Sequence, residues 1–419
     1  MRASVIIPLW NGASIIADCL DALYTHSGSE LHEVICVDNA STDNSAAIVA
    51  EHFPQVRLQH QPVNLGFAGG VNQGMDLATG DLFVLLNQDC LVHENWLSSL
   101  IDAFNTHANY GILGGMIFNA DGSINHSGAY LREPDAYGVH TVAHTATDAP
   151  VEAEYVTGAL FAVRRAVLEA IGPFDEGFYP AYYEEADYCA RARAHGFQIA
   201  SVPGAQATHH FTSRQWREEP LKHSINQHYT RYRFVAKHHA TDQLTRFFAA
   251  EKAATADEMV QDQTLGRLRA ARRIAHDLAT IGEARERDLD EKADTVRRRL
   301  LQVAFDQLAS IALQNQMAEV EEQLQQSTQK LTALQREKEA LADQIFFHSP
   351  RDQEPDSRWR GRWRMVVLRT ISLLSQREHR LLARLNTLHM VHTAQLQRHN
   401  SLLEKKIDLL QQFATDERS

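Results

Sequence analysis

The chain has 419 residues and a formal net charge of −12, from 41 Lys and Arg against 53 Asp and Glu. At roughly 100–200 residues per domain, this length predicts two to three domains. A hydrophobic content of 44% argues against a wholly disordered chain. The acidic balance argues against non-specific nucleic-acid binding, which requires a basic surface.

The cysteines and the N-terminus indicate the compartment. Cys19, Cys36, Cys90 and Cys189 form no CxxC pair, so we expect neither a disulfide framework nor a structural zinc site. The first apolar run is too short for a signal peptide, and no stretch reaches the roughly 18 apolar residues of a membrane span. We therefore expect a cytoplasmic protein, at most peripheral to the inner face of the cell membrane.

The composition changes near residue 240. Residues 1–240 hold 18 of the 21 Gly and 9 of the 11 Pro, with a net charge of −13, whereas residues 241–419 sum to +1. Gly and Pro mark turns. We predict a turn-rich globular domain over residues 1–240, followed by long helices.

The first part alternates short apolar runs with segments of helical spacing. The predicted strands and helices are, in chain order, Ser4–Pro8, Ile15–Tyr24, Glu33–Val37, Ser45–His52, Val56–Gln59, Gly69–Ala78, Leu82–Leu86 and Trp96–His107. This alternation predicts an α/β fold with a Rossmann-like, mostly parallel sheet and helices on both faces. Ligands bind such sheets beyond the carboxyl ends of the strands, which here follow Val37 and Leu86.

Two polar segments follow predicted strands. Asp38 leaves the second strand and can accept hydrogen bonds from a base or ribose, although a turn or a helix cap has the same pattern. The Gly-rich segment Asn64–Gly74 enters a helix. Its glycines allow either close approach of a phosphate or tight helix packing.

Two further segments carry candidate metal ligands. Asp89 follows a fully apolar strand and is either a ligand for Mg²⁺ or Mn²⁺ or a turn-stabilising residue. The extended segment Val202–His210 ends in two histidines, which either ligate such an ion or lie on the surface.

Three carboxylates lie close together at Glu184, Glu185 and Asp187, flanked by aromatic residues. Like charges in a partly apolar setting raise at least one pKa, which suits a general base. Acidic residues in the first turn of a helix give the same pattern, because they favour the positive end of the dipole. The two interpretations are compatible.

The second part divides at two prolines. Residues 241–347 form a predicted long helical region in which a heptad pattern from Leu313 to Ile345 has eight of ten core positions apolar. This favours a coiled coil over a helix packed on the globular domain. Residues 348–362 are a predicted linker and residues 363–415 a further helical segment. The Arg/Trp-rich stretch Arg358–Arg364 either contacts an anionic membrane or stacks Arg on Trp.

Several motifs together resemble one family. They are, in order, SVIIPLWNG, VDNASTDNS, NLGFAGGVNQGM, LLNQDC followed by Trp96, VTGALFAVRRAVLEAIGPFDEGFY, YEEADYCARARAHGF and VPGAQATHH. Residues 1–240 thus resemble a family 2 glycosyltransferase of the GT-A fold, in the bacterial rhamnosyltransferase and galactofuranosyltransferase-like branch.

The resemblance implies a role for each matching residue. Glu185 is the catalytic base, with Glu184 and Asp187 near the acceptor sugar, while Asp89 and His209 bind Mg²⁺ or Mn²⁺. The implied donor-binding residues are Pro8, Trp10, Asn11, Asp38, Ser41, Asp43, Asn64, Gly66, Asn87 and Gly158.

Two positions depart from the family pattern. The DxD-type motif reads Asn87-Gln88-Asp89, which leaves one carboxylate, and Glu185 stands where Asp is usual.

We therefore expect inverting transfer from a nucleotide-diphosphate sugar to a hydroxyl of a saccharide, lipid-linked saccharide or glycoconjugate, in cell-surface polysaccharide synthesis. We expect a homo-oligomer through the coiled coil. The alternative is a catalytically silent nucleotide-sugar binder or scaffold that acts through its tail.

Overall fold

The computed structural model describes residues 1–142, 149–210, 219–257, 261–283 and 291–347, together with seven single positions between residues 376 and 393. The predicted linker 348–362 lies outside the described residues. So does the predicted helical segment 363–415, apart from those single positions, and so does the stretch Arg358–Arg364.

The strands lie between residues 3 and 209. They are β1 (Ala3–Leu9), β2 (Leu31–Asp38), β3 (Arg57–His60), β4 (Leu82–Leu86), β5 (Cys90–Val92), β6 (Tyr110–Phe118), β7 (Ile124–His126), β8 (Ala129–Arg132), β9 (Tyr137–His140), β10 (Val151–Glu152), β11 (Leu160–Arg164) and β12 (Gln198–His209).

The helices intervene between these strands and then continue without them. They are α1 (Ile16–His26), α2 (Ser45–His52), α3 (Gly66–Leu77), α4 (Trp96–Thr106), α5 (Arg165–Ile171), the 3₁₀ turn η1 (Glu176–Phe178), α6 (Glu184–Ala194), α8 (Pro220–His238), α9 (Thr241–Asp257), α10 (Gln261–Glu283) and α11 (Glu291–Phe347).

The main sheet has the strand order β10-β12-β6-β11-β4-β1-β2-β3, with β5 on β12 and β7 on β6. The strands β3, β2, β1 and β4 run parallel, as do β6 and β12. The antiparallel strand β11 lies between these two groups and pairs with both β4 and β6. The carboxyl ends of β1, β2, β4, β6 and β12 therefore lie at one edge of the sheet.

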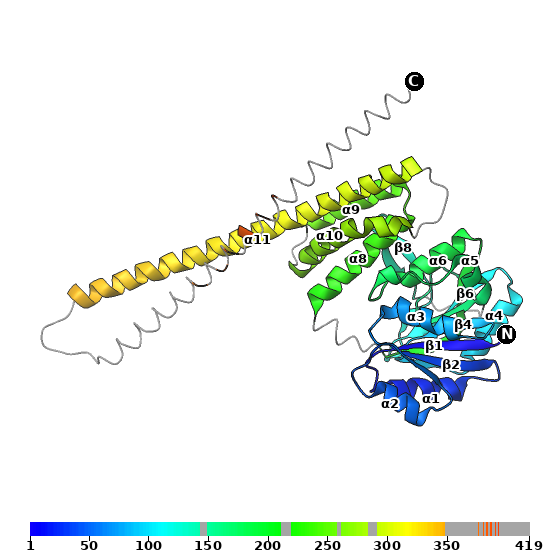
Figure 1. The fold of residues 1–419 in the computed structure, drawn as a ribbon. Coiled ribbons are helices and arrows are strands. Elements are labelled where there is room, and N and C mark those ends of the chain that lie inside the picture. The colour runs from blue at the N-terminus through cyan, green and yellow to red at the C-terminus, as the bar shows by residue number, and fades with distance from the viewer. Residues whose placement is uncertain are drawn as a thin grey trace, which may run out of the picture. The chain divides into compact units, whose positions relative to one another are not determined.

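Each face of the sheet has its own apolar core, because side chains alternate along the buried strands. On β1, Val5 and Ile7 belong to a core with α1 and α4, whereas Ile6 belongs to the opposite core with α3 and α6. Figure 1 shows α1 and α2 on one side of β1 and β2, with α3 on the other side. The predicted α/β sheet with helices on both faces is confirmed.

The eight predicted elements are present, with small shifts at their ends. Leu82–Leu86 and Ser45–His52 have the predicted bounds, whereas α3 begins at Gly66, three residues before its predicted start. The Asn64 side chain accepts a hydrogen bond from the Gly66 backbone N–H at 2.8 Å. The helix therefore begins before the apolar residues whose spacing predicted it. The extended segment at the end of the first part is the long strand β12.

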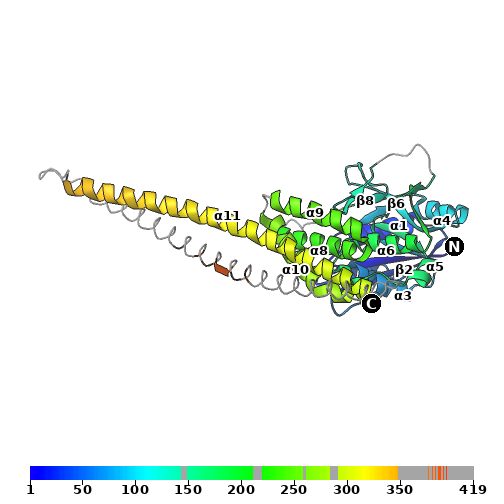
Figure 2. The same cartoon turned by 90° about the horizontal axis from the view of Figure 1, so that it is seen from above.

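The described residues form two compact units. The first contains the described residues of Met1–Ala250 together with Ile281–Glu283, and the second contains the described residues of Glu251–Thr280 and those after 286. In the second unit, α11 is one unbroken 57-residue helix, a straight rod in Figure 2, which confirms the predicted helical tail. Leu313 and Val320 of the heptad pattern are buried within the single chain. Among the described helices, none has the length and apolarity needed to cross a membrane.

Helix α3 lies close to β1 because its inward face is made of small residues. A Cβ atom at Gly74 would overlap the Ile6 side chain, which is completely buried. Gly69 and Gly70 are buried on the same helix. Tight packing is thus one function of the Gly-rich segment.

The variant Gly74→Val is expected to lose about 2–3 kcal/mol of unfolding free energy, because extra methyl groups overpack a filled core. Chemical denaturation measures this loss. The matched control is Asp76→Val, which places the same side chain at an exposed position of α3. Equal stability of the two variants would contradict this packing.

Candidate functional site

Asp38 is fixed at the carboxyl end of β2 by two partners. Its Oδ1 accepts a hydrogen bond from the Ser41 backbone N–H at 3.0 Å, and its Oδ2 lies 2.9 Å from Nδ1 of His60. Burial opposes ionisation, but the hydrogen bonds from Ser41 and His60 prevail and lower the pKa of Asp38. The carboxylate is therefore ionised and oriented at neutral pH.

The turns after β1 and β2 are joined by side-chain hydrogen bonds. The Ser41 Oγ accepts from the Asn11 backbone N–H at 3.1 Å, and Asn11 Oδ1 accepts from the Thr42 backbone N–H at 2.7 Å. The Asp43 carboxylate accepts from the Ala13 backbone N–H at 3.0 Å. These contacts bring the predicted donor-binding residues after both strands into one rigid corner. Asp43 is engaged there as a structural acceptor.

Trp10 extends from the end of β1 beside this corner. Its backbone N–H and carbonyl both bond the Gln88 side-chain amide, at 2.8 and 3.1 Å. Its side chain is 38% exposed, which is unusual for a large aromatic residue that directly follows a buried strand, here β1 with Pro8. An indole held this way offers a stacking surface to a planar group.

The start of α3 closes another side of this edge. Gly66 has a φ of +74°, and a Cβ there would lie 2.8 Å from the Pro180 carbonyl oxygen, so only glycine fits without strain. The Asn39 side chain donates to the Gly66 carbonyl oxygen at 2.8 Å. Gly158 abuts the ring of Phe67 in the same way, since its Cβ would lie 2.9 Å from that ring.

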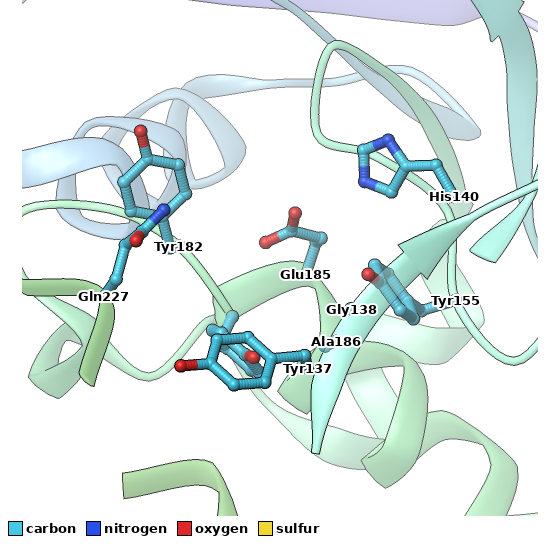
Figure 3. Close-up of a pocket in the computed structure, with 9 residues that line it drawn as sticks. Tyr137, Gly138, His140, Tyr155, Tyr182, Glu185, Ala186 and Gln227 are labelled. Carbon is cyan, nitrogen blue, oxygen red and sulfur yellow. The ribbon is translucent and has the colours of Figure 1, made fainter. Parts of the chain in front are cut away.

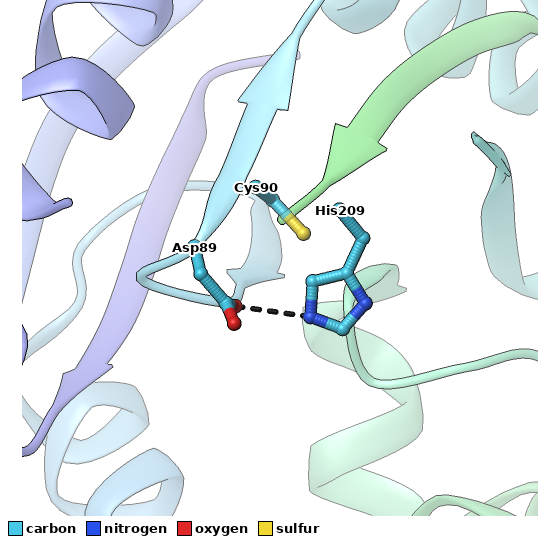
Figure 4. Close-up of side chains that lie close together, drawn as sticks. All are labelled: Asp89, Cys90 and His209. Atoms are coloured by element: carbon cyan, nitrogen blue, oxygen red, sulfur yellow. Dashed lines mark hydrogen bonds and ion pairs between the residues drawn. The ribbon is translucent and has the colours of Figure 1, made fainter. Parts of the chain in front are cut away.

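Asp89 and His209 meet although 120 residues separate them. The antiparallel pair β5–β12 aligns Cys90 with His209, and His209 Nε2 lies 3.0 Å from Asp89 Oδ1 (Figure 4). Both side chains are 13% exposed. Asn87 directly follows β4, and its backbone N–H donates to the Ala159 carbonyl, next to Gly158.

The donor set of this pair fits a divalent cation. A carboxylate oxygen is a ligand for both Mg²⁺ and Mn²⁺, and the imidazole nitrogen favours the transition ion Mn²⁺, with water or a bound anion completing the coordination. The Cys90 sulfur lies within 4.8 Å of both atoms. Burial, followed by the charge of Asp89, raises the pKa of Cys90 well above its ordinary value, so the residue is a neutral thiol here.

Glu185 lines a cavity of about 210 Å³ next to the start of α6. Figure 3 shows its carboxylate pointing into the space between Tyr182 and His140. The other lining residues are Tyr137 and Gly138 of β9, Tyr155, Tyr183 directly before α6, Ala186 of α6 and Gln227 of α8. The side chains around Glu185 are thus mainly aromatic, and their polar groups include tyrosine hydroxyls and the Gln227 amide.

The carboxylates at the start of α6 differ in their partners. Glu184 Oε2 and Glu185 Oε2 are buried without a hydrogen-bond partner among the described residues. Burial raises the pKa of Glu185 to about 7. Burial and the neighbouring Glu185 charge also raise the pKa of Glu184. A carboxyl group with a pKa near 7 can take up a proton at neutral pH.

Asp187 is held in a different environment. It contacts Lys237 Nζ at 2.6 Å, His238 Nε2 at 2.8 Å and Arg191 Nε at 2.9 Å. Burial opposes ionisation, but the hydrogen bond from His238 and the charge of Lys237 hold the pKa of Asp187 far below its usual range. Asp187 does not line the cavity of Glu185. Its contacts join α6 to α8.

Three residues that contact or face the candidate site residues were not singled out from the sequence. His60 orients Asp38, Gln88 holds Trp10, and His140 faces the Glu185 cavity. The position of His60 at the end of the third predicted strand was a usable signal. Gln88 lay inside a motif already quoted, whereas nothing in the sequence marked His140 among 22 histidines.

Residues 4–172 match the model of the family described as glycosyl transferase family 2. This agrees with the family resemblance over that part of the chain, which contains Asp38 and Asp89. The matched segment ends before Glu185 and His209.

Two curated relatives extend the similarity further along the chain. One is an N-acetylglucosaminyl-diphospho-decaprenol L-rhamnosyltransferase of Mycobacterium tuberculosis, 27% identical over 235 residues, or 49% of this chain and 75% of that protein. The other is the amylovoran biosynthesis glycosyltransferase AmsB of Erwinia amylovora, 26% identical over 234 residues, or 53% of this chain and 75% of that protein.

A solved structure shares the fold. The chain superposes on the crystal structure of GalNAc-T7 with UDP, GalNAc and Mn²⁺ at a TM-score of 0.51 and 14% identity. The match covers 67% of this chain and 57% of that one. The sheet is of the GT-A type, as predicted, and a helical C-terminal region follows it.

The variant Asp187→Asn is expected to lose about 3 kcal/mol of stability, the low end for a broken buried ion pair, because Lys237 loses one of its two carboxylate partners and keeps only Asp175. The depressed pKa means that Asp187 stabilises the fold above the unfolded carboxyl pKa of about 4 and loses that effect as pH falls. The difference in denaturation midpoint should therefore shrink in acid.

The matched control is Glu219→Gln, which breaks the exposed pair of Glu219 with Lys222. That change should cost less than about 1 kcal/mol. An Asp187→Asn variant as stable as this control would contradict the structural role of the ion cluster.

Proposed function

We propose that the chain is an inverting glycosyltransferase that moves a sugar from a nucleotide-diphosphate sugar to a hydroxyl group of an acceptor. The observation that carries this proposal is Glu185, whose buried Oε2 has no hydrogen-bond partner among the described residues and which lines a cavity beside the carboxyl edge of a GT-A sheet. The match of residues 4–172 to glycosyl transferase family 2 supports the same reaction class.

The donor nucleotide binds at the corner formed by the ends of β1 and β2. The ionised Asp38 accepts hydrogen bonds from the base, and the exposed indole of Trp10 stacks beside it. Pro8, Asn11, Ser41 and Asp43 shape this corner, and the remaining proposed donor residues, Asn64, Gly66, Asn87 and Gly158, line the sugar side.

Asp89 and His209 hold the divalent cation, Mg²⁺ or Mn²⁺. When bound, such an ion neutralises charge on the diphosphate leaving group. This matters in a segment with a net charge of −13, because an anionic donor approaches an acidic domain. GalNAc-T7 was crystallised with UDP and Mn²⁺, which supports the choice of ion.

Glu185 acts as the general base. It takes the proton of the acceptor hydroxyl while that oxygen forms a bond to the anomeric carbon, and the bond from that carbon to the diphosphate oxygen breaks. Attack from the face opposite the leaving group inverts the anomeric configuration. The aromatic and hydroxyl lining around Glu185 suits a saccharide acceptor. Glu184 lies at the same helix start, while Asp187 supports the site by fixing α6 to α8.

The finer assignment follows the relatives. We place the chain in the rhamnosyltransferase and galactofuranosyltransferase-like branch, acting in cell-surface polysaccharide synthesis on a saccharide or lipid-linked saccharide. The names of the Mycobacterium and Erwinia proteins support this setting.

The tail completes the proposal. We place the protein in the cytoplasm, with peripheral membrane contact through Arg358–Arg364, a stretch outside the described residues. We also propose that α11 forms a coiled coil that makes the chain a homo-oligomer, which light scattering of the full chain tests.

The variant Glu185→Gln is expected to lower transfer at least about 100-fold, since general-base catalysis contributes about 10²–10⁴-fold. Calorimetric binding of the nucleotide-sugar should remain within threefold of the original chain, because the donor corner is unchanged. Product formation from a labelled donor measures the first quantity.

The control is Glu154→Gln, an acidic residue outside the cavity, which should retain near-normal transfer. Substantial turnover by Glu185→Gln would overturn the assignment of the base. Failure of every nucleotide-sugar to bind the original chain would overturn the proposed function itself.

A further inference from the structure

Three ligand-type side chains converge where β5 meets the end of β12. The Oδ1 of Asp89, the Sγ of Cys90 and the Nε2 of His209 supply one carboxylate, one thiol and one imidazole, and these ligand atoms all lie within 4.8 Å of one another. In Figure 4 the Cys90 sulfur points toward the His209 ring, on the same side as the Asp89 carboxylate. Cys90 also belongs to the apolar core of the sheet, but packing alone does not require a sulfur atom beside two candidate ligands.

The backbone holds the three residues in fixed positions. Cys90 and His209 are partners in the β5–β12 ladder, and the His210 backbone N–H donates to the Asp89 carbonyl at 2.8 Å. Cys90 is completely buried, whereas Asp89 and His209 are partly exposed. An ion can therefore enter from the side of Asp89 and His209 and meet the sulfur at the inner side of the site.

The sulfur changes which metal the site prefers. Carboxylate and imidazole groups bind both hard and borderline ions, but thiolate selects soft or borderline ions such as Zn²⁺ and Cd²⁺ over Mg²⁺ and Mn²⁺. Three protein ligands of the Asp, Cys and His types with one position left open are the pattern of a four-coordinate zinc centre.

We infer that Asp89, Cys90 and His209 together form a three-ligand site for a thiophilic divalent cation of the Zn²⁺ class. On binding, the Cys90 S–H bond breaks, a sulfur–metal bond forms, and the proton passes to the solvent. Hard ions engage Asp89 and His209 alone. A thiophilic ion thus displaces the ion proposed for transfer. The three-ligand site does not depend on the proposed reaction; only its competition with the transfer ion rests on the proposed function.

The test is a titration of the full-length protein with Cd²⁺, monitored through the ultraviolet thiolate-to-cadmium charge-transfer band. The original chain should develop this band with one equivalent of Cd²⁺. The variant Cys90→Val should lack the band and bind Cd²⁺ at least tenfold more weakly by calorimetry. Its affinity for Mn²⁺, measured by paramagnetic resonance of the free ion, should change less than threefold.

The matched control is Cys36→Val, which replaces an equally buried thiol of β2 and should retain the band. Val retains the apolar packing at both positions, and thermal melting verifies that both variants fold. Should Cys90→Val fail to fold, His209→Ala serves as the second variant and should also lower the Cd²⁺ affinity at least tenfold. Absence of the band in the original chain, or its persistence in Cys90→Val, would overturn the inference.

Discussion

The distribution of positive charge around α6 determines what its carboxylates can do. Lys237, His238 and Arg191 all contact Asp187, so this acid is ionised and structural. Glu185, two residues earlier, points the other way into an aromatic cavity, and burial raises its pKa to about 7. The surroundings of each carboxylate thus give similar groups different ionisation states, as in enzymes that use one carboxylate as an acid and another as a base. If the cations faced Glu185, its pKa would fall and it would be a weaker base.

The sheet supplies the second constraint. Parallel strands bring Asp38 and Trp10 to the edge at which Asn87 follows β4, and the β5–β12 pair brings His209 to Asp89. The whole-chain charge of −12 conceals how acidic this domain is, because the tail is nearly neutral. A cation beside Asp89 would supply locally the positive charge that an anionic donor needs. The same edge carries the thiol of Cys90, which extends the range of ions it can select.

The sequence predicted β1 to β4 and the extended segment that forms β12, because apolar runs bounded by turn residues, such as Leu82–Leu86, are typical of buried strands. It did not predict the central strands β6 and β11. It could not predict β5, whose three residues carry no period and which is defined by pairing with β12. Nor could it separate the Glu185 environment from that of Asp187, because two of the three partners of Asp187, Lys237 and His238, come from a helix some fifty residues later. Local sequence patterns identify the candidate carboxylates, whereas contacts with residues distant in the sequence determine which of them are ionised.

The pH dependence of kcat/KM for transfer tests the central claim most directly. Glu185 accepts a proton only when ionised, so the rate constant should rise with pH, fall about tenfold per unit below the pKa, and level off above about 7. The profile should be measured with saturating Mn²⁺, and with Glu154→Gln as the reference. A rise of kcat/KM centred near pH 7 would agree with a desolvated carboxylate as the base. A profile that is flat from about pH 5 to pH 8 would contradict it.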